Sequence, residues 1–392
     1  MKRIWLKLFA VSLVIGLLGF YFNLAPTTAA PGKNLKACFI YIGPIGDYGW
    51  THAHDVARKY VEKIFPWLET AYVESVAEGD VETYIDKMVQ EGCNVIFTTS
   101  FGYMDGTIAA AKKYPDTIFF HCSGFKRAPN VGTYFAELYQ LYYLTGLMAG
   151  ALTKSGKVGY VGAYPTPEVK RHINAFTIGV RQVNPNATVN VRWIYEWYSP
   201  TAAKEAAEAL ITDGADVFSF TEDSPTVIQV ADEHGLPSFS HYSPMYRFAP
   251  NHVVSGELVN WGVIYADILA KIYAGVYTSK NLEKVDYWWM LKEGAVELGA
   301  KPGMPINPLY KDKLEAVKVN DPVLGEISVY DLVMTRLEQM SEETVLYDPF
   351  TGPIYDRKGN LRIKAGTRAS HDELWTMQWA VEGVVGPWPG EP

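Results

Sequence analysis

Short apolar runs alternate with helical patterns along most of this chain. Apolar runs of roughly four to eight residues predict buried strands, and apolar residues repeating every three or four positions predict the helices between them. The first series predicts strands at 35–42, 70–75, 94–99, 117–121 and 131–135, with helices near 52–65, 81–91 and 104–114. Such alternation indicates a parallel sheet with helices on both faces.

The pattern restarts after a helical stretch at 137–153 and the short segment 153–156. The second series predicts strands at 157–163, 188–194, 216–220 and 236–240, with helices at 168–183, 201–212 and 225–234. A strand at 252–255 and a helix at 259–274 are expected to return to the first lobe, and 285–392 are harder to place.

The predicted fold class is therefore α/β, with two Rossmann-like lobes that have parallel sheets and are joined by a hinge. We expect 33–154 plus 251–280 to form the N-terminal lobe, and 155–250 plus 281–392 to form the C-terminal lobe with a C-terminal extension. The cleft between two such lobes is the expected ligand site, and the lobes are expected to close on a ligand.

The first 30 residues have the pattern of an export signal. Three basic residues (Lys2, Arg3 and Lys7) precede an apolar stretch at 8–22, and small residues follow up to Ala30. The apolar stretch is shorter than the roughly 20 residues that a membrane span needs. We expect a cleaved signal peptide at 1–30 and a protein exported to the periplasmic or extracellular face of the cytoplasmic membrane, with an uncleaved anchor as the alternative.

Charge and cysteine content narrow the choice of partners. The net charge is −8, and no basic run follows the first residues, which argues against nucleic acid as a partner.

Three cysteines (Cys38, Cys93 and Cys122) give neither a disulfide framework nor a metal spacing, so we expect buried thiols. His52 and His54 are two residues apart and face different sides of a helix. We expect no metal and no cofactor.

The loop at 43–51 is the most informative candidate site. It follows the first predicted strand and precedes a helix, which is where open α/β sheets bind ligands. It contains a carboxylate (Asp47), a large flat ring (Trp50) and a hydroxyl (Thr51), and its glycines allow close backbone approach. We expect Trp50 to stack on a planar solute. The alternative is a tight turn with a packed tryptophan.

Other strand-end loops are expected to meet this loop across the cleft. The candidate ligand-binding residues there are Ser100, Phe101, Gly102, Trp197, Asp223, Ser224, His241, Tyr242, Glu257, Asn260 and Trp261. Ser100 and Asp223 have helix capping as an alternative or additional role.

Nothing in the sequence arranges a nucleophile beside a base, so we expect no enzymatic activity. The glycine spacing G-x-x-G-x-x-G at 43–49 differs from the dinucleotide fingerprint, and Asp47 would repel a phosphate there. The loop at 99–105 also lacks the G-x-S-x-G motif of a hydrolase.

Several of these loops carry a family resemblance. The matching segments are 42–50, 99–105, 114–116, 159–162, 168–169, 175–180, 183–185, 214–217 and 377–386. Together they resemble the basic membrane protein family of substrate-binding proteins, the purine-nucleoside-receptor type of ABC importers. The resemblance spans nearly the whole chain after the signal, and implies a type I periplasmic binding protein fold.

The resemblance also implies a ligand and a partner. It implies that Trp50 stacks on a purine base such as adenine, or on a nucleoside, and that a monomer delivers this ligand to an ABC permease. Thr51 stands where many relatives have Asn, and Ser199 where some have Asp. Two alternatives remain open: a sensory or binding receptor for another planar or amide solute, and a secreted nucleoside-cleaving hydrolase.

Overall fold

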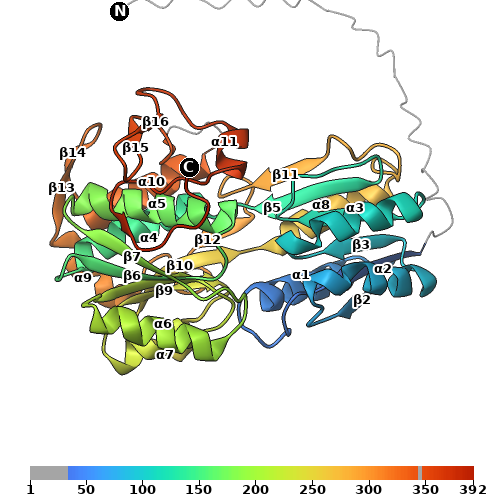
Figure 1. Cartoon of the computed structure of the whole chain (residues 1–392), viewed down its shortest axis with the longest axis horizontal. Coiled ribbons are helices and arrows are strands. Elements are labelled where there is room, and N and C mark those ends of the chain that lie inside the picture. The colour runs from blue at the N-terminus through green and yellow to red at the C-terminus, as the bar shows by residue number, and fades with distance from the viewer. Residues whose placement is uncertain (1–33, 343–346) are drawn as a thin grey trace, which may run out of the picture. The chain divides into compact units, whose positions relative to one another are not determined.

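The computed structural model describes residues 34–342 and 347–392, which form two large sheets flanked by helices and two small sheets of two strands each (Figure 1). The expected signal peptide lies outside the described residues. Among the described helices, none combines the length and the apolar character needed to cross a bilayer.

The first sheet has six parallel strands in the order β11-β5-β4-β3-β1-β2. Its strands are β1 (Leu35–Ile40), β2 (Leu68–Val73), β3 (Val95–Thr98), β4 (Ile118–Cys122), β5 (Val131–Ala136) and β11 (Asp286–Trp289). Its helices are α1 (Trp50–Ile64), α2 (Val81–Gln90), α3 (Met104–Lys113) and α8 (Trp261–Tyr273). One face packs on α1 and α8, the other on α2 and α3.

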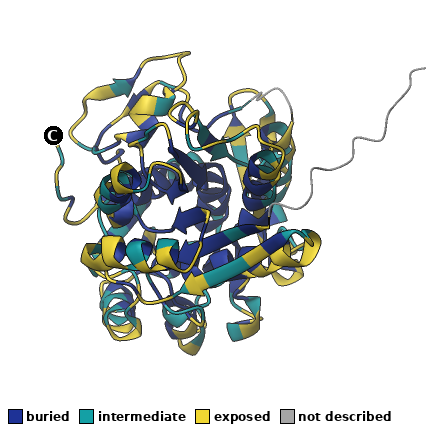
Figure 2. Ribbon diagram, turned by 90° about the vertical axis from the view of Figure 1, so that its right-hand side faces the viewer, coloured by how far each residue is buried: buried dark blue, intermediate teal, exposed yellow. Residues whose placement is uncertain are grey.

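The second sheet has seven strands in the order β12-β10-β9-β8-β6-β7-β17, and only β12 is antiparallel. Its strands are β6 (Lys157–Gly162), β7 (Thr188–Trp193), β8 (Val217–Thr221), β9 (Ser238–Tyr242), β10 (Val253–Val259), β12 (Val296–Leu298) and β17 (Val384–Val385). Its helices are α4 (Tyr139–Leu152), α5 (Pro167–Val183), α6 (Pro200–Thr212) and α7 (Thr226–Glu233). Figure 2 shows that buried residues concentrate in the strands, while the outer sides of the helices are exposed.

The C-terminal segment adds short elements beside the second sheet. They are α9 (Lys311–Glu315), β13 (Lys318–Asp321), β14 (Gly325–Ser328), α10 (Val329–Ser341), β15 (Ile354–Tyr355), β16 (Leu361–Ile363) and α11 (His371–Trp375). The last strand, β17, pairs with β7 at the edge of the second sheet.

Five strands of each sheet follow the same order. The strands β2-β1-β3-β4-β5 correspond to β7-β6-β8-β9-β10. In this arrangement the strand order reverses between β1 and β3 in the first sheet and between β6 and β8 in the second. Sheets of this kind bind ligands in the crevice at that point. The α/β architecture with two parallel-sheet lobes is therefore confirmed.

Three elements differ from the expected division into lobes. The strand expected to return to the first lobe, β10, pairs with β9 in the second sheet, although α8 does pack on α1 as expected. Conversely, β11 pairs with β5 in the first sheet. The chain passes to the second lobe before α4, near Glu137, and not at 153–156, because α4 packs against α5 and β10.

The contact between α4 and α5 explains why α4 belongs to the second lobe. This helix is apolar on all sides, as expected for a helix that is buried on every face. A Cβ atom at Gly146 would lie 2.1 Å from the Phe176 carbonyl oxygen, and one at Gly179 would lie 2.2 Å from that of Tyr143. Glycine is therefore required for the two backbones to approach this closely.

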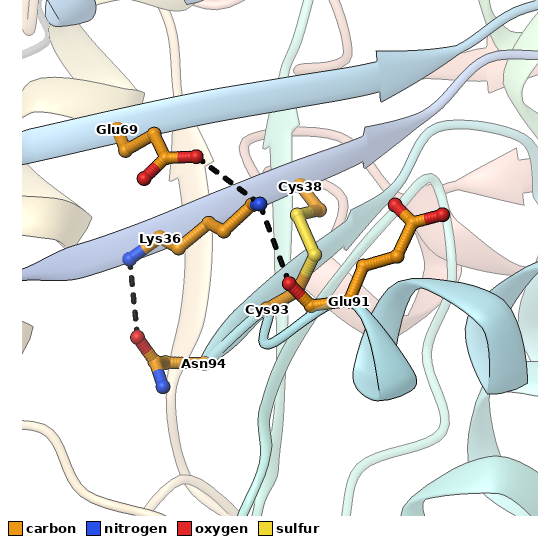
Figure 3. The surroundings of a disulfide bond; sticks show 6 residues. All are labelled: Lys36, Cys38, Glu69, Glu91, Cys93 and Asn94. Carbon is orange, nitrogen blue, oxygen red and sulfur yellow. Dashed lines mark hydrogen bonds and ion pairs between the residues drawn. A yellow bond between two sulfur atoms is a disulfide. The ribbon is translucent and has the colours of Figure 1, made fainter.

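A disulfide joins Cys38 on β1 to Cys93 in the turn before β3 (Figure 3). The expectation of unpaired thiols is wrong for these two cysteines, because the parallel pairing of β1 and β3 brings residues 55 positions apart into contact. Figure 3 also shows Lys36 beside the bridge, with its ammonium 3.1 Å from the Glu69 carboxylate. Cys122 is buried and free, as expected.

Candidate functional site

A cavity with an empty volume of about 280 Å³ lies where the carboxyl ends of the two sheets meet. Six of the predicted residues line it: Trp50, Ser100, Phe101, Trp197, Asp223 and Tyr242. The first three come from loops of the first sheet and the last three from loops of the second. The expectation that strand-end loops meet in one place therefore agrees with the structure for these six residues.

Trp50 is the first residue of α1, and its ring is held on two sides. Its indole Nε1 donates a hydrogen bond to the Thr99 carbonyl at 2.6 Å. The rings of Tyr242 and Trp261 pack edge-on against it, with centroids 5.0 and 5.2 Å away. The side chain is only 6% exposed, so its position is fixed before any ligand binds.

Asp47 does not line the cavity and instead caps the first turn of α1. Its carboxylate accepts backbone N–H groups from Gly49 (2.9 Å), Thr51 (3.0 Å) and His52 (2.9 Å). These are donors that a helix start otherwise leaves unsatisfied. Burial is the largest influence and raises the pKa of Asp47 to about 6, although the three N–H groups oppose the rise.

Asp223 supplies a carboxyl group to the cavity from the loop after β8. It is buried, and its backbone N–H donates to the Trp197 carbonyl at 2.8 Å. Burial raises the pKa of Asp223 well above its usual value, and the nearby carboxyls of Asp47 and Glu222 raise it further. The protonated form of such a carboxyl group can both donate a hydrogen bond to a ligand and accept one from it.

Glu168, in the first turn of α5, is a lining residue that was not predicted. Its carboxylate accepts the hydroxyl of Ser123 (2.8 Å) from the first lobe and that of Tyr242 (3.0 Å) from the second. Burial raises the pKa of Glu168 above its usual value. Ser123 and Ile42 also line the cavity without having been predicted. The signal available for Glu168 was its position at the start of the helix that follows β6.

Three further predicted residues, Thr51, Gly102 and Trp261, adjoin lining residues in the sequence or in space but do not line the cavity. The Thr51 hydroxyl accepts the N–H of Gly43 at 3.2 Å, and the N–H of Gly102 donates to Glu78 at 3.1 Å. Trp261 stacks on His54, with ring centroids 4.4 Å apart, and so supports Trp50 from behind.

Four predicted residues lie away from the lining. Ser224 donates to Glu222 at 3.0 Å, and His241 contacts the Tyr142 hydroxyl at 2.6 Å. Glu257 accepts the hydroxyl of Thr145 inside the second lobe, where burial raises the pKa of Glu257 to about 8. Asn260 is exposed, and its backbone N–H donates to the Ala295 carbonyl.

Backbone strain concentrates at the carboxyl ends of the strands. Within the described ranges, the non-glycine residues with positive φ are Tyr48 (62°), Ser75 (56°), Ser123 (63°), Tyr195 (55°) and Tyr242 (59°). They follow or end β1, β2, β4, β7 and β9, respectively. Such conformations cost free energy and cluster at ligand sites, which supports the assignment of this edge as functional.

No group of three or more histidine, cysteine or carboxylate side chains within 34–342 and 347–392 is arranged to hold a metal ion. The cavity itself contains two carboxyl groups, hydroxyls and aromatic faces. This donor set is suited to binding a small, flat molecule that carries N–H groups.

Comparison with known proteins gives matches along most of the chain. The sequence profile of the PnrA-like ABC transporter substrate-binding proteins (Bmp) matches residues 34–332. A purine-binding protein of Brucella abortus is 38% identical over 356 residues, which are 90% of this chain and 93% of that protein. A putative ABC transporter glucose-binding protein of Haloferax volcanii is 37% identical over 287 residues, 73% of this chain and 72% of that protein.

Solved structures agree on the fold. An ABC transporter solute-binding protein from Aeropyrum pernix K1 superposes with a TM-score of 0.66 at 16% identity, covering 89% of this chain and 100% of that one. An ABC transporter solute-binding protein from Conexibacter woesei superposes with a TM-score of 0.59 at 18% identity. The superposition covers 78% of this chain and 96% of that one.

Proposed function

Because this chain belongs to the PnrA-like family of ABC transporter substrate-binding proteins, we propose that its cavity carries a purine for import. Proteins of this family act outside the cytoplasm and deliver their ligand to a membrane permease. The protein binds and releases its ligand without changing it, and does so as a monomer whose residues 1–30 are a cleaved export signal. The intact mass of the exported protein tests the cleavage.

The single observation that carries the proposal is the pairing of a fixed tryptophan face with buried carboxyl groups. Trp50 supplies the flat surface, and Asp223 and Glu168 supply acceptors for the N–H groups of a base. Base–aromatic stacking contributes roughly 1–3 kcal/mol.

A hexose is the second candidate, because the Haloferax volcanii relative is described as glucose-binding. The purine is preferred because the purine-binding relative matches 90% of this chain, whereas the glucose-binding relative matches 73%. Calorimetry with purines and glucose, described next, distinguishes the purine from the hexose.

Calorimetry with adenine, guanine, adenosine, guanosine and glucose tests the proposal. Trp50→Ala should weaken purine binding by roughly one to two decades, because the stacking surface is lost. Trp50→Phe should lose less, and Asp223→Ala should also weaken binding. Trp67→Ala is the matched control, since Trp67 stacks on Tyr273 with centroids 4.0 Å apart and does not line the cavity. Wild-type affinity in Trp50→Ala, or glucose as the preferred ligand, contradicts the proposal.

A further inference from the structure

A larger groove adjoins the cavity and has no role in the function proposed above. It has an empty volume of about 1230 Å³ and shares two lining residues, Phe101 and Trp197, with the cavity. Three further aromatic side chains line it: Phe125, Tyr164 and Trp375. The cavity and the groove are therefore adjacent, and the side chains of Phe101 and Trp197 line both of them.

The polar side chains of the groove already have partners within the protein. Thr166 accepts a backbone N–H of α5 at 3.3 Å, and Thr376 donates to a carbonyl of α11 at 2.7 Å. Gln378 accepts from an ammonium group on α5, and Glu78 accepts the Ser100 hydroxyl at 2.7 Å. Each of these side chains keeps the capacity for at least one further hydrogen bond, and beside them the groove presents five aromatic side chains to a ligand.

One wall of the groove is rigid and comes from the C-terminal extension. Trp375, in α11, lies beyond residue 332, where the match to the family profile ends. It is 6% exposed and packs on Trp288 with centroids 4.8 Å apart. The Arg171 guanidinium lies 5.6 Å from its ring centroid and is paired with the buried Glu137 carboxylate. These contacts hold the Trp375 side chain in place.

The first lobe contributes an exposed aromatic residue to the groove. Phe125 is 47% exposed, although it lies among the other aromatic residues of the groove. Tyr164 contacts Trp197, with centroids 5.1 Å apart, and so steadies the boundary between groove and cavity. An apolar or aromatic group lying in the groove would cover Phe125 and remove its surface from water, which is favourable.

We propose that the groove is a second subsite for an alkyl or aryl substituent on the purine held in the cavity. The ligand class is therefore an N-substituted purine with an apolar substituent, not one with a ribose. Five aromatic side chains line the groove, and their surface suits an apolar substituent better than a ribose, which carries several hydroxyl groups. This inference rests on the proposed purine function.

The test measures affinities for adenine, adenosine, 6-benzylaminopurine and 9-benzyladenine by calorimetry. At least one benzyl derivative should bind the wild type about tenfold more tightly than adenine, because the added ring stacks in the groove. Phe125→Ala should remove most of this gain and leave adenine affinity unchanged. Trp375→Ala should also remove most of the gain for the benzyl derivatives. Trp375 is buried, so this substitution can impair folding, and in that case the exposed Phe125→Ala variant still provides the test. Tyr60→Ala, at a tyrosine that is also 47% exposed but lies outside the groove, is the matched control.

The outcomes separate this inference from the proposed function. If adenine binds but neither benzyl derivative binds more tightly, the subsite is wrong and the purine function stands. A gain for adenosine equal to that for the benzyl purines would also overturn the apolar subsite. If no purine binds at all, the proposed function fails, and this inference fails with it. A gain that Phe125→Ala abolishes and Tyr60→Ala retains supports the subsite.

Discussion

At the scale of single residues, Glu168 connects the two lobes directly at the cavity wall. It is 4% exposed, and its two oxygens accept one hydroxyl from each lobe, those of Ser123 and Tyr242. Both of these hydroxyl residues have positive φ, so the backbone holds them in place at a cost in free energy. The same carboxyl group therefore forms hydrogen bonds to both lobes and lines the cavity.

Removing this carboxyl group should weaken ligand binding more than it destabilises the fold. Hydrogen bonds to charged groups contribute about 1.5–3 kcal/mol, so Glu168→Ala should weaken purine affinity roughly 10- to 100-fold. Glu168→Gln keeps the shape of the side chain and one acceptor oxygen, so it should lose less purine affinity than Glu168→Ala. Calorimetry measures the affinities, and urea unfolding measures stability. Wild-type affinity in both variants would show that Glu168 has no part in binding.

At the scale of elements, the Cys38–Cys93 bridge fixes the start of the first sheet. It joins β1 to the turn before β3 and so closes a loop that contains α1, β2 and α2 (Figure 3). A cross-link over 55 residues stabilises the fold mainly by restricting the unfolded chain. Neither cysteine lines the cavity, so the bridge affects stability and not the ligand contacts.

Cys93→Ser should lower the free energy of unfolding by about 2–4 kcal/mol and leave purine affinity unchanged. Urea unfolding with and without dithiothreitol measures this. The reductant should destabilise the wild type and Cys122→Ser, whose free thiol is not bridged, but should have no further effect on Cys93→Ser. Equal sensitivity of all three proteins to the reductant would contradict the pairing.

At the scale of the whole described chain, the contact between the lobes depends on Gly49. A Cβ atom there would lie 2.7 Å from the Cα and 2.9 Å from the carbonyl carbon of Asp223. Both are backbone atoms of the second lobe, so no side-chain rotation can relieve the overlap. The Ser243 hydroxyl also donates to the Gly49 carbonyl at 3.0 Å across the same contact.

Gly49→Ala should therefore keep the lobes apart and weaken ligand binding. Overpacking costs about 1–3 kcal/mol, which corresponds to roughly 5- to 100-fold in affinity. Small-angle scattering should show less compaction on adding a purine than in the wild type. Gly46→Ala is the control in the same loop, because a Cβ there meets no atom within 4 Å. Equal compaction and affinity in both variants would refute the role of Gly49.

The sequence by itself determined the features that depend on local order. Apolar periodicity predicted most strands and helices of both lobes, because a buried strand or an amphipathic helix must repeat its apolar residues at the spacing of its own geometry. The rule that parallel sheets bind ligands at their carboxyl ends then pointed to Trp50, Ser100 and Asp223, which do line one cavity.

Only the tertiary structure decided which of several chemically similar residues meet. Asp47 and Asp223 both follow strands. The Asp47 carboxylate accepts hydrogen bonds from N–H groups at the start of α1, whereas Asp223 lines the cavity. Glu168 reaches the cavity because the register of the two lobes brings Ser123 and Tyr242 to it. Likewise, the disulfide and the sheet to which β10 belongs depend on contacts between residues distant in sequence. Periodicity carries no information on such contacts, because it reports only which face of an element is buried and not what covers that face.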